Sequence, residues 1–162
     1  MPMNYHLRRQ DRAITEEAAI ERLLSDGAYT TIALADGDEP YVVTLSYGYE
    51  SNPRRLYFHV AHEGRKLDII DRNPRACATI ISENGYTNGE CEHPFESLVI
   101  SGTIRRVTDE AEKLVAIHAL VNHLETDPAE YWSSRSWTLE QRIGGFSALC
   151  LEIEHVTGKF GK

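Results

Sequence analysis

A pair of adjacent cations at the start of a short predicted helix is the part of this sequence best suited to bind a ligand. The helix follows Gly64 and carries Arg65 and Lys66 in its first turn. Backbone N–H groups at a helix start have no partner inside the helix and attract anions. Arginine can hold a phosphate through two parallel hydrogen bonds, and lysine adds a point charge. The pattern therefore predicts a phosphate site.

Plainer interpretations of these and nearby residues stay open. Arg65 and Lys66 could be solvated charges on a surface helix. His59 ends the preceding predicted strand, where it is as often a structural residue as a functional one, and His62 lies in the next loop. Either histidine could supply the single axial ligand that haem needs. Cys91 and a histidine two positions later lie in a polar loop, but no further ligands are placed by spacing, so we predict no metal site.

Composition narrows the class of protein. The chain has 162 residues, 41% of them hydrophobic, and a net charge of −8, which favour one acidic globular domain and disfavour a nucleic-acid binder. No apolar run approaches the ~20 residues that span a bilayer. The opening residues, MPMNYHLRRQDR, lack the apolar stretch of a signal peptide, so we expect no membrane association and a cytoplasmic location. Cys77 and Cys150 lie in apolar runs, which predicts two small core residues.

Hydrophobic periodicity predicts a mainly β protein. We expect an N-terminal arm over residues 1–14 and a single domain over 15–162. Helices are predicted over 15–25, 64–72 and 109–124, with Thr15 and Asp109 as N-caps, and strands over 29–35, 41–49, 56–60, 76–82, 97–107 and 148–154. Six strands in hairpin order with flanking helices favour a small closed β-barrel. A parallel α/β sheet is disfavoured because helices do not separate successive strands.

Two segments carry patterns that bear on a site. The strand over 41–49 alternates, with Tyr41, Val43, Leu45 and Tyr47 on one face and Val42, Thr44 and Ser46 on the other. The helix over 109–124 has Leu114, Ile117, Val121 and Leu124 at helical spacing. Residues 125–146 are mixed, with Asp127-Pro128 a helix start or stop. Trp132 and Trp137 in that segment could be core residues, interface anchors or covers for a cofactor.

A set of ordered motifs resembles the split-barrel flavoproteins related to pyridoxamine-phosphate oxidase. The motifs are RRQDR (8–12), VTLSYGY (43–49), YF (57–58), GRK (64–66), NPR (73–75), SLVISG (97–102) and TGK (157–159). The whole chain looks closest to the nitroimidazole-resistance (Nim-type) branch of that family, from about residue 8 to 159. The resemblance implies a six-stranded antiparallel split β-barrel with flanking α-helices, which binds FMN as a homodimer with flavin sites at the interface.

The resemblance also assigns residues to the flavin. It implies that Arg65 and Lys66 bind the FMN phosphate, beside Gly64, where the oxidase has a serine. It implies further contacts from the neighbouring strands. The strand residues Val42, Val43, Thr44 and Leu45 would lie against the isoalloxazine ring, and His59 and Val60 would lie close to the ring or the phosphate tail. His59 is the candidate catalytic residue.

The function that the resemblance implies is a flavin-dependent reduction of small organic molecules, nitroaromatics such as nitroimidazoles among them. No motif matches the C-terminal arginine- and tryptophan-bearing segment of the oxidase, so vitamin B6 oxidation is not expected. The alternative is a protein that binds flavin or haem without turnover. A deazaflavin could replace FMN, although the phosphate-binding residues favour FMN.

Overall fold

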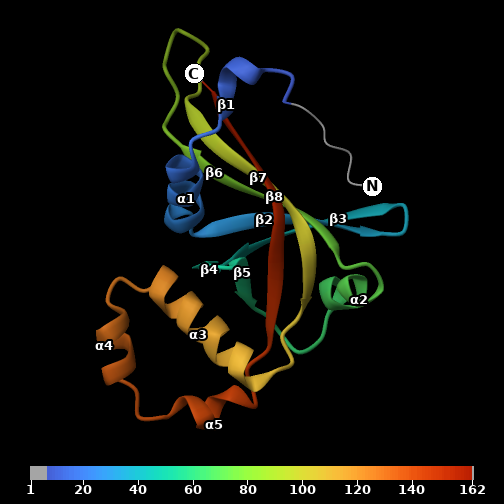
Figure 1. Cartoon of the computed structure of the whole chain (residues 1–162), viewed down its shortest axis with the longest axis vertical. Helices are drawn as coiled ribbons and strands as arrows, with labels where there is room; N and C mark the ends of the chain where they lie inside the picture. Colours follow the sequence, from blue (N-terminus) through green and yellow to red (C-terminus); the bar gives the residue numbers. More distant parts are fainter. Residues whose placement is uncertain (1–6, 162) are drawn as a thin grey trace.

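The computed structural model describes residues 7–161, so the first six residues of the predicted arm lie outside the described residues. Within this range the chain forms one antiparallel sheet of eight strands with flanking helices, which confirms the predicted mainly β class (Figure 1). The predicted number of six strands is wrong, because the strand expected over 41–49 is two strands and a short strand at Ala13–Ile14 also joins the sheet. The strands are β1 (Ala13–Ile14), β2 (Tyr29–Asp36), β3 (Glu39–Ser46), β4 (Gly48–Ser51), β5 (Arg54–His59), β6 (Arg75–Glu83), β7 (Phe95–Arg106) and β8 (Ala148–Gly161). Their order is β3-β2-β6-β7-β8-β5-β4, and β1 pairs with β8.

The sheet curls because its two ends are consecutive in the chain. β3 and β4 lie at opposite ends of the strand order, yet only Tyr47 separates them. The Tyr47 side chain is fully buried, and its hydroxyl donates a hydrogen bond to the Leu24 carbonyl at 2.8 Å. The prediction of one strand over 41–49 is therefore wrong. The chain leaves one edge of the sheet at Tyr47 and joins the other, and this crossing makes the barrel.

Five α-helices surround the sheet within residues 7–161. They are α1 (Glu17–Asp26), α2 (Arg65–Arg72), α3 (Glu110–Leu124), α4 (Pro128–Ser133) and α5 (Leu139–Ile143). The predicted cap at Asp109 is confirmed, because its carboxylate accepts the Glu112 N–H at 2.9 Å. The predicted cap at Thr15 is wrong, since α1 begins at Glu17 after Glu16. Helix α3 packs on β4 and β5, and α4 and α5 lie beside it on the side of the barrel away from α2 (Figure 1).

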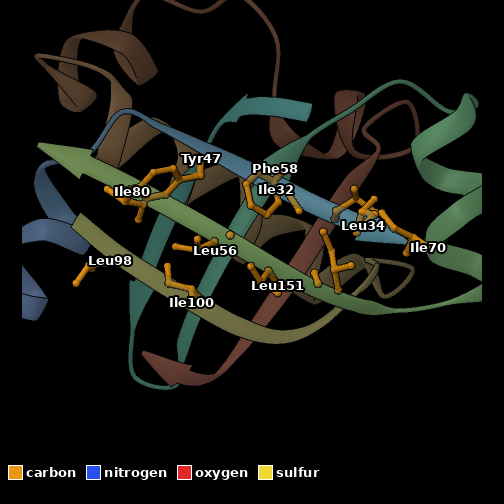
Figure 2. Close-up of a cluster of buried hydrophobic side chains, with 14 of the residues drawn as sticks. Ile32, Leu34, Tyr47, Leu56, Phe58, Ile70, Ile80, Leu98, Ile100 and Leu151 are labelled. Carbon is orange, nitrogen blue, oxygen red and sulfur yellow. The ribbon is translucent and has the colours of Figure 1, made fainter. Parts of the chain in front are cut away.

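Alternate strand residues fill the barrel, and Figure 2 labels eight of them together with Tyr47, from between β3 and β4, and Ile70, from α2. A second, smaller cluster beneath α3 contains Tyr57, Ala116 and Cys150. Cys150 is buried as predicted, but the prediction for Cys77 is wrong because its side chain is exposed. In β6 the residues on either side, Ala76 and Ala78, are the ones that face the core. The apolar run around Cys77 does not reveal that one face of its strand is uncovered.

The helix that borders the candidate site has a different buried stripe from the predicted one. In α3 the buried residues are Ala116, Ile117, Leu120 and Val121. Leu114 and Leu124 are 36% and 41% exposed, because α3 is covered by strands on one side only. At the N-terminal end, Ala13 and Ile14 of the predicted arm pair with Lys159 and Gly158 of β8. No helix between residues 7 and 161 has the length and apolar character to cross a membrane.

Candidate functional site

The start of α2 depends on a backbone conformation that only glycine adopts readily. Gly64 has φ 136° and ψ 162°, in a region that is essentially restricted to glycine. Its carbonyl accepts hydrogen bonds from Leu67 at 2.8 Å and Asp68 at 3.3 Å, which closes the first turn. A Cβ atom on Gly64 would meet no atom within 4 Å, so conformation and not space selects glycine here. A serine in this position would strain the helix start.

The two predicted phosphate-binding cations lie at the surface beside the start of β3. The Arg65 guanidinium pairs with Glu39 Oε1 at 2.9 Å and lies 5.1 Å from the centre of the Tyr41 ring. The hydrogen bond from Arg65 to Glu39 raises the pKa of the guanidinium. Lys66 is half-buried in the same turn. A phosphate at this helix start would therefore compete with the carboxylate of Glu39 for Arg65.

The strand β3 presents alternate residues to the two sides of the sheet. Val42 and Thr44 are exposed on its outer face, whereas Val43 and Leu45 pack against the barrel core. β3 is also an edge strand, with no partner on its second edge within residues 7–161. The side chains of Val42 and Thr44 can thus touch a ligand on the outer face, and Val43 and Leu45 can offer only backbone groups.

A cavity of about 640 Å³ lies at the other end of β3, between the sheet and helices α3 to α5. We call it the α3 cavity. It is lined by Ser46, His59, Ile117, Leu120, Val121, Leu124, Glu125, Tyr131, Trp137, Arg142, Gly145 and Phe146. β3 therefore runs from the Arg65 side chain, which contacts Glu39 and Tyr41 near its start, to this cavity at Ser46.

Three predicted site residues lie at the end of β5 and in the loop after it: His59, Val60 and His62. Of these, only His59 lines the α3 cavity. Its imidazole stacks on the Phe146 ring, with the ring centres 5.1 Å apart and an interplanar angle of 17°. Val60 instead lies in the barrel core, and its N–H donates to the Ser147 carbonyl at 3.0 Å. His62 is exposed in the loop before α2 and is not part of the cavity wall.

Residues 131–146 form the outer wall of the α3 cavity, which the sequence patterns did not predict. Trp137 lies against the Arg142 guanidinium at 5.3 Å, and Phe146 lies against His59. Trp132 contacts His118 instead and does not line the cavity. The signal in the sequence was the density of aromatic residues and arginines without strand alternation. This composition indicates that the segment packs or binds, but it does not indicate which helix the segment contacts.

A network of ion pairs ties α3 to the sheet behind the cavity. Arg105 of β7 donates two hydrogen bonds of 2.8 Å to the two carboxylate oxygens of Glu112, and a third of 3.0 Å to Glu152. Tyr57 and Cys150 lie beneath this network, and burial raises the pKa of the Cys150 thiol to about 12. The thiol is therefore neutral at physiological pH and acts as a core residue.

We expect this network to make the free energy of unfolding depend on pH in the acidic range. The hydrogen bonds from Arg105 lower the pKa of Glu112. A lowered folded-state pKa gives stability that is present above the unfolded value, about 4.3, and is lost as pH falls through the folded value. Glu112→Gln should therefore lower the free energy of unfolding at pH 7. We expect a loss of only about 1 kcal/mol, because the ion pair is partly exposed to solvent. Urea denaturation at several pH values should show the difference from wild type shrinking below about pH 4; a constant difference would contradict this assignment.

Comparison with known proteins identifies relatives by family and by fold. Residues 16–160 match the family model described as pyridoxamine 5'-phosphate oxidase. No curated protein matches the sequence. Among solved structures, a candidate 5-nitroimidazole antibiotic resistance protein from Bacteroides thetaiotaomicron superposes with a TM-score of 0.75 at 24% identity, covering 92% of this chain and 87% of that one.

Two further solved structures share the fold. The flavocytochrome Anf3 from Azotobacter vinelandii has a TM-score of 0.79 at 18% identity, with 98% of this chain and 73% of that chain covered. The FAD and heme binding protein from Mycobacterium smegmatis has a TM-score of 0.75 at 18% identity, with 93% and 74% covered. At these identities the likeness establishes the split-barrel fold, which confirms the predicted architecture.

Proposed function

Because the chain belongs to the pyridoxamine 5'-phosphate oxidase family, we propose that it is a flavoprotein that binds FMN and reduces small organic molecules, nitroaromatics among them. The family resemblance predicted from the sequence is confirmed. The observation that carries the proposal is the course of β3. The strand runs from Arg65, which pairs with Glu39 at its start, to Ser46, which lines the cavity that holds His59. An elongated molecule with a phosphate at one end and a flat ring at the other suits this arrangement.

The residues present fit a flavin. The helix start at Gly64 offers backbone N–H groups, Arg65 and Lys66 to a phosphate. The unpaired edge of β3 offers backbone groups to the polar edge of a ring, and Val42 and Thr44 offer side chains to its face. When bound, FMN would supply the electron transfer, and the protein would supply position and electrostatic field. A deazaflavin stays the alternative cofactor, and the two cations favour FMN.

His59 is the residue best placed to handle a proton in such a reaction. Its ring is exposed to the α3 cavity and held in one orientation by Phe146. Histidine can donate or accept a proton near neutral pH without a large change in its environment. We propose that His59 donates a proton to the molecule being reduced, while the apolar side chains of α3 exclude water from it.

Absorption spectroscopy of the purified protein tests the proposal. After addition of FMN and removal of the excess, bands near ~450 nm should remain with the protein, as expected of a resident flavin. Reduction by NADH or NADPH and reoxidation by an added nitroaromatic would then distinguish an enzyme from a flavin carrier. A protein that stays colourless after incubation with FMN would rule out the proposed function.

Haem in the α3 cavity is a second candidate, favoured by one observation. The cavity has the aliphatic residues of α3 on one wall and is also lined by an imidazole, His59, and haem needs one axial histidine in an apolar slot. Two solved structures of the same fold are named as a flavocytochrome and as a FAD and heme binding protein. A Soret band after haemin addition would support this candidate, and it would be compatible with flavin on β3.

We propose further that a second copy of the chain completes the flavin site. We define the outer sheet face by Tyr29, Val42, Thr44, Thr79, Ile81 and Val99, which lie on the side of their strands that faces away from the barrel core. Thr44, Thr31, Thr79 and Val99 form one row across four strands. Val42, Ile81 and Val99 are 60%, 61% and 48% exposed. A flavin on β3 alone would be open to solvent, and a copy of this flat face would cover it.

Val99→Lys should separate the proposed dimer. An unpaired charge buried at an interface costs about 3 kcal/mol, which corresponds to roughly a 100-fold weaker association. Sedimentation velocity over a concentration series should show the wild type as a dimer and the variant as a monomer. Val115→Lys is the matched control, since Val115 is 40% exposed on α3 and should leave the dimer intact. A monomeric wild type would contradict the proposal.

A further inference from the structure

One arginine in the wall of the α3 cavity differs from those on the strands and on α2. Arg142 in α5 contacts the Trp137 ring at 5.3 Å and forms no ion pair within residues 7–161. By contrast, each arginine of β5, β6, β7 and α2 pairs with a carboxylate: Arg54, Arg55, Arg65, Arg72, Arg75, Arg105 and Arg106. A guanidinium that lines a cavity and has no carboxylate partner within residues 7–161 has its hydrogen-bond donors available to a ligand.

We infer that the α3 cavity binds a planar aromatic molecule that carries a carboxylate, with the carboxylate on Arg142. This names the substrate class of the proposed reductase and in that respect rests on the proposed function. The fork of the guanidinium matches a carboxylate through two parallel hydrogen bonds. Arg142 is exposed, so the pairing gains its strength from this two-point geometry and not from burial.

The remainder of the wall selects the shape of the ligand. The stacked pair His59 and Phe146 offers one flat surface, and the aliphatic residues of α3, such as Ile117 and Leu120, line the same space. Aromatic and aliphatic surfaces of this kind favour a flat ring over a flexible chain. A neighbouring shallow groove is lined by Asp127, Glu130 and Arg135 among others. Glu125 lines both this groove and the α3 cavity, so it lies where the two meet.

Two kinds of molecule share this chemistry, and paired probes distinguish them. One is a small aromatic acid, tested with 4-nitrobenzoate against the neutral 4-nitrobenzamide. The other is a porphyrin with its propionate groups, tested with haemin against haemin dimethyl ester. In each pair the ring is the same and a neutral amide or ester replaces each carboxylate, so a preference for the acid indicates that a cation in the cavity binds the carboxylate.

Calorimetric titration of the full chain with each probe is the experiment. One of the acids should bind at least about tenfold more tightly than its neutral partner, as expected for a charge-assisted bidentate contact. Arg142→Gln should remove that preference and leave the neutral probe unchanged. Arg135→Gln is the control, because Arg135 lies in the same segment and contacts Tyr131 at 4.1 Å but lines only the shallow groove. Arg142→Lys should keep part of the preference.

The outcomes separate this inference from the proposed function. A preference in the first pair identifies a small aromatic acid, and a preference in the second identifies a porphyrin. The inference is overturned if neither pair shows a preference, or if Arg142→Gln retains it. It is also overturned if saturating FMN displaces the acid, since the flavin would then fill the cavity while the proposed function stands. An Arg142-dependent preference in a protein that refuses FMN would support the inference and reject the flavoprotein proposal.

Discussion

Replacing Arg65 and Lys66 together with alanine should weaken FMN binding by about 100-fold. Each cation would lose a charge-assisted contact with the phosphate, and exposure to solvent limits the loss of affinity for the pair to about 100-fold. Arg65 is half exposed and Lys66 half-buried, at a helix start that would still offer its backbone groups. Some affinity should therefore survive. Quenching of FMN fluorescence during titration measures the change.

Two single substitutions make the test specific to the helix start. Glu39→Gln removes the carboxylate that pairs with Arg65, so FMN should bind a few-fold more tightly. Arg72→Ala removes a cation from the other end of α2, where it pairs with Asp36, and should leave the affinity unchanged. If the folded double variant keeps the wild-type affinity, the phosphate binds elsewhere.

Replacing His59 with alanine should have the second large effect. General acid catalysis by a positioned histidine contributes about 10²–10⁴-fold to a rate. We therefore expect nitroaromatic reduction to fall by about 100-fold, with FMN affinity close to that of the wild type. If haem occupies the α3 cavity, the same variant should lose the Soret band because the iron loses its axial ligand. Stopped-flow reoxidation of reduced protein and a haemin titration measure the two effects.

The controls for His59 come from its neighbours. His62→Ala removes an exposed imidazole that does not line the cavity, so both measurements should match the wild type. His59→Phe keeps a ring stacked on Phe146 but cannot transfer a proton or bind iron. It should behave like the alanine variant if the imidazole itself is required. Full activity and a full Soret band in His59→Phe would make His59 a packing residue only.

Local patterns in the sequence determined most of the elements that make up the site. Alternation over residues 41–46 assigned Val42 and Thr44 to the outer face, because side chains of a strand alternate strictly between its two sides. Asp109 marked the start of α3 because an N-cap interacts with residues only three positions away. The ordered motifs, GRK at 64–66 among them, determined the family. All of these depend on residues close together in the chain.

The tertiary structure decided what depends on contacts between distant residues. Local pattern did not show that β3 ends before Tyr47, whose burial depends on α1 and the barrel core. Nor did it show that Cys77 is exposed, since an apolar strand can have one uncovered face. Arg65 meets Glu39 across 26 residues, and Arg142 lines a cavity with His59 from a segment far along the chain. Such pairings follow from strand order and helix packing, which no short stretch of sequence encodes by itself.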